Sequence, residues 1–447
     1  MPDRIHELCS SLEAERQPYV LATVVRVMGS ASAKPGSKAV IDAQGRNLFG
    51  WVGGGCAEGL VREEALKALA ERQTRIVRVD LDDEVLGVGM PCGGNMEVYL
   101  EPRLPPRQVL ICGDNRLARH LAAVAGVLGF SAQVHGPKAA PEHFPSAERV
   151  QAGGWDELAP EPGATVLIAG DHEDHGKVLR RVLAAKPAYV AMVASRKIAQ
   201  GLLAALRRQG LSEAELAVVR TPAGLDLGAR TLEEISISVL SEVLAWERAR
   251  DGRPLRRVSE TAQEPATAPR NAPTDPPPPL VIVGHGRIAE ELARLATLTG
   301  WAVTVNAINA LATDFPPGAC LITDDLEYAR LEITPRTFVV VATLHKGDHL
   351  SMQKALAGDA AYIGLIASRK RTGLILDFLR EKNVPPERMR RVFAPAGLNL
   401  GALNPTEIAF SILCEMVTVH RQGTARPLVE LERLPSGDSD ACRRLFQ

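Results

Sequence analysis

A long internal repeat constrains the fold of this chain more than any other feature. Two motifs and several single residues recur at one constant offset, in order and without a gap. The matched pairs are Ala-Ser-Arg-Lys at 194–197 and 367–370, Pro-Ala-Gly-Leu at 222–225 and 395–398, Gly228-Ala229 and Gly401-Ala402, Glu234 and Glu407, and Glu242 and Glu415. Such ordered self-similarity indicates that one module has been duplicated.

Each copy begins with an apolar strand that runs into a glycine turn and then a helix. In the second copy the turn is Gly284-His285-Gly286-Arg287-Ile288-Ala289, the G-x-G-x-x-A form of the dinucleotide fingerprint. The pattern predicts an α/β protein with two Rossmann-like, doubly wound parallel sheets. Gly284, Gly286 and Arg287 are the candidate nucleotide-binding residues.

The first copy departs from this fingerprint. Asn115 stands where the second glycine is expected and would obstruct close approach to a pyrophosphate, and Asp114 adds a negative charge. The acidic residue that holds ribose hydroxyls is missing from both copies, where the matching positions are His135 and Asn306. We therefore expect nucleotide affinity, NAD(P) or another nucleotide, to lie in the second copy.

Two cysteines in the first hundred residues are flanked by glycines. Gly53-Gly54-Gly55-Cys56 leads into an amphipathic run over 56–72, and Cys92-Gly93-Gly94 leads into a strand. Glycines let backbone N–H groups form an anion-binding nest, and a helix N-terminus favours thiolate over thiol. The two stretches predict one site in which Cys56 is partly thiolate. The alternative is a tight turn with a buried cysteine.

Composition narrows the remaining possibilities. With 447 residues the chain is too long for one core, and 52 basic against 53 acidic residues give no electrostatic case for nucleic acid or an acidic membrane. No apolar run approaches the length of a membrane span, and the odd number of scattered cysteines favours a reducing cytoplasm over a disulfide framework. Cys112, Cys320 and Cys414 lie within apolar runs and are expected to stay protonated and unreactive.

These features predict a sequence of domains. They are a mixed α/β module at 1–105, the first Rossmann-like copy at 106–250, a proline-rich linker at 251–279, the second copy at 280–425 and a tail at 426–447. Because a duplicated domain tends to reuse its homodimer surface internally, we expect the copies to pack as a pseudo-twofold pair. The apolar helices at 234–245 and 407–419 also suit a homodimer.

Together these motifs resemble the XdhC/CoxI family, the accessory factors that mature molybdenum hydroxylases such as xanthine and carbon monoxide dehydrogenases. The resemblance rests on Gly29-Ser30, Lys34-Pro35-Gly36, Lys38, Gly53-Gly54-Gly55-Cys56, Glu58, Cys92-Gly93-Gly94, Ser368-Arg369-Lys370, Pro395, Gly397-Leu398, Gly401-Ala402 and 405–409. Three features differ from the family pattern: two Rossmann modules, Ala33 in place of an arginine, and the residues His285 and Arg287 in the fingerprint.

The resemblance implies a chaperone more than a turnover enzyme. Its role would be to bind molybdenum cofactor (molybdopterin or its dinucleotide form), protect the sulfurated form and pass it to an apo molybdenum hydroxylase, with a cysteine desulfurase as a further partner. Cys56 and Cys92 would ligate molybdenum or carry sulfur, because soft metal–sulfur chemistry prefers thiolates. The glycines and Glu58, with Lys34 and Lys38, would line that site, and Ser368-Arg369-Lys370 would hold a phosphate.

Two other functions stay open at this point. One is an NAD(P)-dependent oxidoreductase that uses the second Rossmann copy. The other is a scaffold without catalytic activity that binds one chain of a molybdoenzyme.

Overall fold

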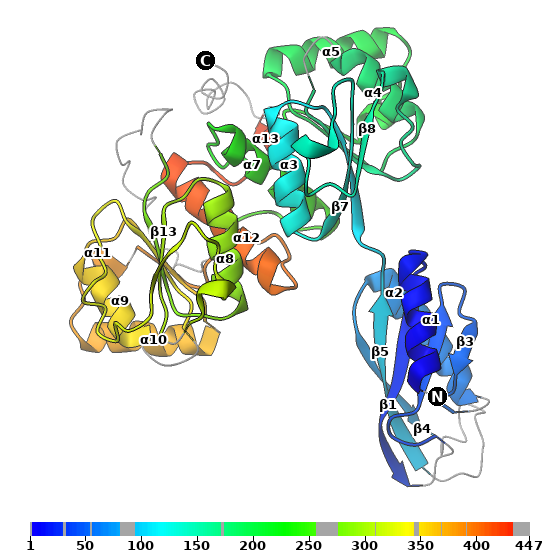
Figure 1. Ribbon diagram of the computed structural model, residues 1–447, viewed down its shortest axis with the longest axis horizontal. Helices are drawn as coiled ribbons and strands as arrows, with labels where there is room; N and C mark the ends of the chain where they lie inside the picture. Colours follow the sequence, from blue (N-terminus) through cyan, green and yellow to red (C-terminus); the bar gives the residue numbers. More distant parts are fainter. Residues whose placement is uncertain are drawn as a thin grey trace. The chain divides into compact units, whose positions relative to one another are not determined.

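The computed structural model describes residues 2–29, 33–53, 56–80, 94–170, 174–255, 276–308, 310–343, 348–367, 369–389 and 391–431. The chain divides into two compact units, Met1–Arg107 and Gln108–Gln447, each of which is described here by itself. Figure 1 labels their helices and strands.

The first unit is an antiparallel sheet with one helix packed against a face of it. The strand order is β3-β2-β1-β5-β4, and neighbouring strands pair in antiparallel fashion. Val20, Ala22 and Val24 alternate along β1 and pack with Val61 and Ala65 of α2. The elements are α1 (Pro2–Ala14), β1 (Tyr19–Gly29), β2 (Lys38–Asp42), β3 (Asn47–Gly50), α2 (Cys56–Glu71), β4 (Arg75–Asp80) and β5 (Gly94–Arg103).

The second unit holds both copies of the repeat, and each builds a six-stranded sheet. The strand orders are β8-β7-β6-β9-β10-β11 and β14-β13-β12-β15-β16-β17, which are the 3-2-1-4-5-6 order of a Rossmann fold. Strands β9, β10, β12, β15 and β16 are buried along their whole length, as expected for strands covered on both faces. The predicted fold class is confirmed.

The elements of the first copy are β6 (Arg107–Cys112), α3 (Arg116–Val127), β7 (Phe130–Gly136), β8 (Arg149–Ala152), β9 (Thr165–Ile168), α4 (His175–Ala184), β10 (Tyr189–Met192), α5 (Arg196–Arg208), α6 (Glu213–Leu216), β11 (Val219–Arg220) and α7 (Leu232–Glu247). Those of the second are β12 (Leu280–Val283), α8 (Arg287–Leu298), β13 (Val303–Asn306), β14 (Cys320–Ile322), β15 (Phe338–Val341), α9 (Asp348–Ala357), β16 (Tyr362–Leu365), α10 (Arg369–Glu381), α11 (Pro386–Met389), β17 (Val392–Phe393) and α12 (Pro405–Arg421); α13 (Leu428–Leu431) follows.

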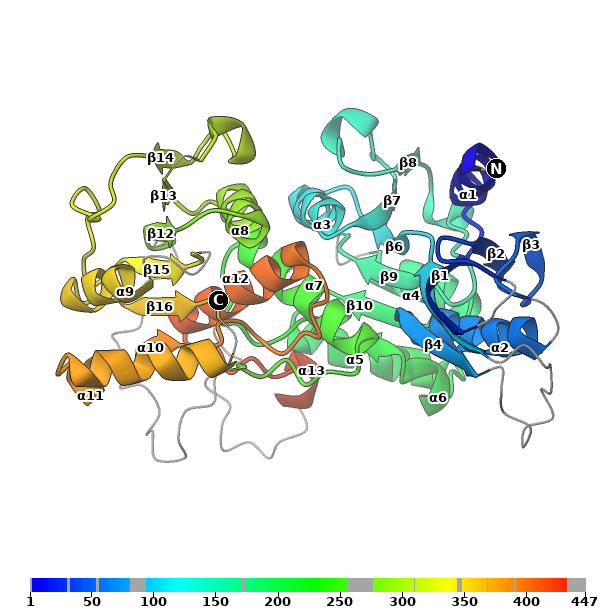
Figure 2. The same cartoon turned by 90° about the horizontal axis from the view of Figure 1, so that it is seen from below.

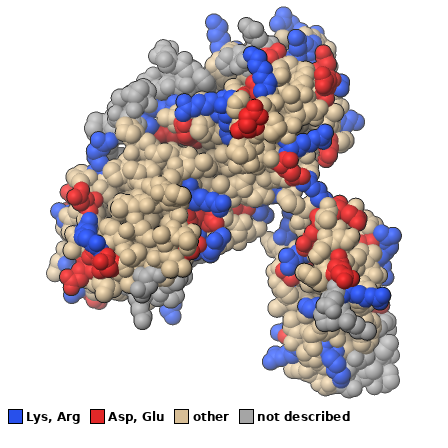
Figure 3. Space-filling model, viewed as in Figure 1, with Lys and Arg blue, Asp and Glu red and all other residues tan. Residues whose placement is uncertain are grey.

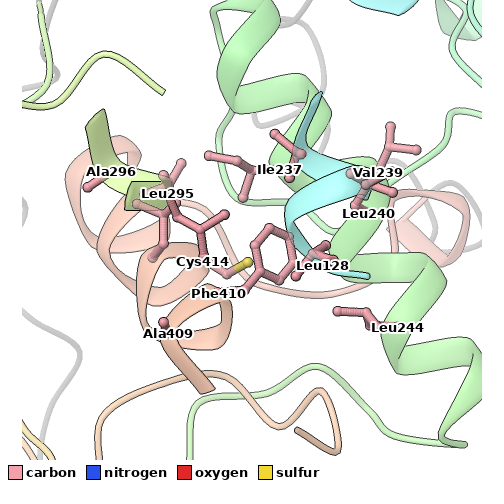
Figure 4. Close-up of a cluster of buried hydrophobic side chains, with 14 of the residues drawn as sticks. Leu128, Ile237, Val239, Leu240, Leu244, Leu295, Ala296, Ala409, Phe410 and Cys414 are labelled. Atoms are coloured by element: carbon pink, nitrogen blue, oxygen red, sulfur yellow. The ribbon is translucent and has the colours of Figure 1, made fainter. Parts of the chain in front are cut away.

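The two copies pack through equivalent helices. Helix α7 contacts α12 and α3 contacts α8, and Figure 2 shows α7 and α12 side by side between the two sheets. One apolar core runs through both copies, with Leu240 and Leu244 of α7 facing Phe410 of α12 (Figure 4). The Cys414 thiol hydrogen-bonds with the Ser241 hydroxyl, and these two residues occupy the same position in the repeat. Contact between equivalent positions is what a twofold axis produces.

Charged residues repeat the same symmetry. The Glu234 carboxylate pairs with Arg421 at 2.7 Å, and the Glu407 carboxylate pairs with Arg248 at 3.5 Å. Glu407 matches Glu234 and Arg421 matches Arg248 at the constant offset of the repeat. Each copy therefore supplies one acid and one arginine to the other, and the predicted pseudo-twofold pairing is confirmed.

The chain that follows each last helix crosses to the opposite copy. After α12, the Leu428 N–H donates to the Gly224 carbonyl at 2.9 Å. After α7, the Leu255 N–H donates to the Gly397 carbonyl, also at 2.9 Å. We call residues 249–255 and 422–431 the crossing arms. Residues 426–431, which the sequence placed in the tail, therefore belong to this exchange, while 432–447 lie outside the described residues.

The helices and the surface agree with the charge balance of the sequence. Among the described residues, no helix combines the length and the apolar character that crossing a bilayer requires. Figure 3 shows basic and acidic side chains interspersed on the face that it displays.

Candidate functional site

The segments that carry the two glycine-flanked cysteines start and end at one end of the first unit's sheet. Gly29, the last residue of β1, pairs in register with Gly94, the first residue of β5. Asp80, which ends β4, pairs with Asn95. A strand end, a strand start and the approach to α2 thus converge, because Gly53 packs against Met96 of the same strand β5.

Gly53 occupies a backbone conformation that requires glycine. Its φ is +126°, and a Cβ at this position would lie 3.1 Å from the Met96 Cε atom and 3.3 Å from the Ala57 Cβ atom. A side chain here would be strained both by the dihedral angle and by these neighbours. The positive φ expected of this glycine turn is therefore present at Gly53, while Gly54 and Gly55 lie outside the described residues.

Cys56 is the first residue of α2. That is where the sequence places it, and the partial positive charge of a helix N-terminus lowers the pKa of a thiol in general. Glu58 lies in the first turn of the same helix and is half-buried. Cys92 and Gly93 lie outside the described residues, two and one positions before Gly94, where β5 begins.

The lysines of the first unit lie near the turn that follows β1. Lys34 is exposed, and its N–H donates to the Ser37 hydroxyl at 3.1 Å. Lys38 is also exposed and donates from Nζ to the Thr23 hydroxyl at 3.0 Å. Ala33, which replaces an arginine of the family pattern, is buried in the core. The cationic side chain closest to this position along the chain is therefore that of Lys34.

The fingerprint of the second copy forms the turn expected of it. Gly284 has a φ of +111°, and a Cβ there would lie 2.6 Å from the Ala342 carbonyl oxygen, so the close approach to β15 requires glycine. Gly286 precedes α8 with a φ of +108°. The Arg287 guanidinium pairs with Glu291 at 2.9 Å and with Glu290 at 3.3 Å, along its own helix.

The repeated Ser-Arg-Lys motif lies at the carboxyl end of the fifth strand of each sheet. In the first copy the Ser195 hydroxyl caps α5 by accepting the Ile198 N–H at 3.4 Å. In the second copy Arg369 is the first residue of α10 and Lys370 is exposed, while Ser368 lies outside the described residues. The motif opens a helix in both copies.

Of the three cysteines expected to be unreactive, one differs from that expectation. Burial raises the pKa of the Cys112 and Cys414 thiols, in agreement with the prediction. Cys320, however, is exposed, because β14 is an edge strand of its sheet. The prediction that its apolar surroundings bury Cys320 is wrong, so a thiol-labelling experiment must account for it.

A buried acidic cluster repeats in both copies and was not assigned a role from the sequence. The Glu242 Oε2 atom accepts the Gly224 N–H at 2.7 Å and the Tyr189 hydroxyl at 3.0 Å. Burial raises the pKa of Glu242 to about 7. The recurrence of Glu242 as Glu415 was the signal in the sequence, since a carboxylate kept at a matched position in an apolar helix needs a partner.

Comparison with known proteins agrees with the arrangement of these modules. The model of the XdhC Rossmann domain matches twice, at residues 109–243 and 280–416, and the model of the XdhC and CoxI family matches residues 12–80. Among curated relatives, the uncharacterized protein YqeB of Escherichia coli is 33% identical over 53% of this chain and 44% of its own length. The chain thus spans less than half of that relative.

Two further relatives have names that state a role. The molybdenum cofactor insertion chaperone PaoD of Escherichia coli is 25% identical over 50% of this chain and 82% of its own length. A probable xanthine dehydrogenase component of Bacillus subtilis is 30% identical over 33% of this chain and 44% of its own length. With both halves of the repeat and the first unit matched by the models of one family, the chain belongs to the XdhC and CoxI family.

Proposed function

We propose that this protein is a maturation factor that binds molybdenum cofactor in its sulfurated form and delivers it to an apo molybdenum hydroxylase of the xanthine or carbon monoxide dehydrogenase type. Family membership and the role named for PaoD support this proposal. The observation that carries it is the convergence of Gly29, Gly53 and Gly94 at one end of a sheet, with Cys56 opening α2 beside them.

The residues of this end suit such a cofactor. Gly53 has no side chain, and its positive φ turns backbone N–H groups in a direction that other residues rarely adopt. The N-terminus of α2 favours an anion and lowers the pKa of a thiol placed there. Thiolates are the ligands that soft metal–sulfur chemistry prefers. The donor set therefore fits a phosphate-bearing group that holds a metal through sulfur.

Each residue has a distinct proposed task. The cofactor, when bound, supplies the molybdenum centre that the client enzyme uses. Cys56 and Cys92 act as exchangeable thiolate ligands or carry sulfur as a persulfide received from a cysteine desulfurase. The glycine N–H groups and Lys34 bind phosphate, and a reducing cytoplasm keeps both thiols available.

Replacement of the cysteine tests the central assignment. Cys56→Ser retains the shape of the side chain and a hydrogen-bond donor but removes sulfur. We expect this variant to fold normally, to retain less pterin and molybdenum on purification, and to mature the hydroxylase poorly. The matched control is Cys320→Ser, which changes an exposed cysteine on the other unit and should mature the client as the wild type does. If Cys56→Ser matures the hydroxylase as well as the wild type, the thiol is structural and the assignment is wrong.

Thiol labelling gives a second readout. Iodoacetamide at neutral pH should modify Cys56 first in a Cys320→Ser background, and bound cofactor should protect it. Mass spectrometry of co-purified small molecules separates the other two functions: NAD(P) would favour an oxidoreductase, and the absence of both pterin and nucleotide would favour a scaffold.

A further inference from the structure

The two fingerprint turns differ in what fills them. In the first copy the Asn115 Oδ1 atom caps α3 by accepting the Ala118 N–H at 3.0 Å. The neighbouring Asp114 carboxylate accepts the Lys138 N–H at 2.6 Å. A side-chain oxygen and a negative charge thus already occupy the place where a phosphate would bind, so this turn is closed by its own residues.

In the second copy the equivalent turn is open. Gly286 replaces Asn115, and no described side chain caps α8. The first N–H groups of a helix lack partners within the helix, and together with the helix dipole they favour an anion. The arginine and glutamates of the first turn, Arg287, Glu290 and Glu291, are paired with one another. They add no net positive charge at this turn, so its anion affinity depends on backbone groups.

A second observation beside this turn points to a ligand. Asn306 ends β13, its carbonyl oxygen accepts the Gly284 N–H at 2.8 Å, and only 2% of the residue is exposed. Its Nδ2 donates to the Asp325 carbonyl at 3.2 Å, but its Oδ1 finds no partner among the described residues. In the first copy the equivalent His135 forms a hydrogen bond between Nε2 and the Gly154 carbonyl. A buried acceptor without a partner is rare in folded proteins.

We propose that the second copy binds a nucleoside diphosphate and that the first copy does not. The diphosphate lies at the N-terminus of α8, where Gly284 and Gly286 allow close approach. A ribose hydroxyl donates to the Asn306 side chain at the end of the second strand, the position where Rossmann folds hold the ribose. The chain therefore has one nucleotide site for its two Rossmann modules. This site lies in a different unit from Cys56 and stands independently of the function proposed for that cysteine.

Isothermal titration of the full chain tests the proposal with four probes: ADP, CDP, GDP and NAD⁺. We expect one nucleotide per chain. Preference for ADP and NAD⁺ would identify a free adenine nucleotide as the ligand, and preference for CDP or GDP would identify the nucleotide half of a dinucleotide cofactor. Both outcomes support the site. Failure of all four probes to bind at millimolar concentration overturns it.

Paired substitutions locate the site. Gly286→Asn gives the second copy the closure of the first and should weaken binding at least about tenfold. The matched control Asn115→Gly should leave the affinity unchanged, because Asp114 still occupies that turn. The reverse pattern places the site in the first copy and overturns the proposal.

A gain of affinity guards against a folding failure at Gly286, whose φ of +108° suits few other residues. Asn306→Asp supplies the acid that Rossmann folds use for ribose hydroxyls and should strengthen binding of ADP several-fold, but not of 2′-deoxy-ADP. If the folded Asn306→Asp variant binds both probes as the wild type does, Asn306 does not face a ribose and the proposal fails.

Discussion

Replacing Arg421 by Met should destabilise the paired Rossmann copies far more than the same change at Arg248. The Arg421 side chain is fully buried and its Glu234 partner is 5% exposed, with 2.7 Å between Nε and Oε1. Removing one member of a buried ion pair leaves the other charge uncompensated and costs about 3–5 kcal/mol. Glu234 keeps the Arg230 N–H as a donor to Oε2 at 2.8 Å, which places the expected loss near the lower end, about 3 kcal/mol.

Arg248 provides the matched control, because it occupies the equivalent position in the first copy. Its side chain is 22% exposed and lies 3.5 Å from Glu407, so water compensates part of the loss and about 1 kcal/mol is expected. Urea unfolding followed by tryptophan fluorescence measures both, since the Trp301 ring lies 6.3 Å from the ring of His420. Equal losses for the two variants would refute the argument that burial separates these symmetric pairs.

Two further predictions follow from single residues. Burial raises the pKa of Glu242 to about 7 from 4.5, so the folded state binds more protons than the unfolded state between these values; stability should fall by up to about 3 kcal/mol as pH rises through this window. Glu242→Gln should remove that part of the decline, as urea midpoints at pH 5 and pH 8 would reveal, and an unchanged pH dependence would contradict it. Gly53→Ala should lower the melting temperature of the first unit more than Gly36→Ala, because both glycines have positive φ but only Gly53 has neighbours within 4 Å of a Cβ; equal shifts would contradict the packing argument.

Much of the fold follows from the sequence because its signals are local or repeated. Apolar strands such as Leu280–Val283 and the turn at Gly284 are specified by a few adjacent residues, and duplication extends each inference to the other copy. The crossing arms could not be inferred, because irregular segments pair through backbone groups that leave no pattern. Arg421 had the same difficulty, since an arginine in the last turn of a helix is usually solvated.

The candidate sites were predictable to different degrees. The need for glycine at Gly53 and Gly284 follows from the motifs, and positive φ at both agrees with it. The exposure of Cys320 did not follow, because a short apolar run reads alike in an edge strand and in a central one. The contrast between Asn115 and Gly286 could be stated from the sequence, but the hydrogen bonds that close the first turn required the structure.

The interface explains why the first copy can carry a closed fingerprint without losing its fold. What joins the copies is α7 and α12, the two buried acid–arginine pairs and the crossing arms, and none of these includes the turn at Asp114. The Leu428 arm pairs with the Gly224 loop of the first copy, so that copy remains necessary to the second even without a ligand. A duplicated module held in this way can lose a binding turn in one copy while both copies are retained, and this predicts that separating them at the linker would expose the shared core around Phe410 and Leu240.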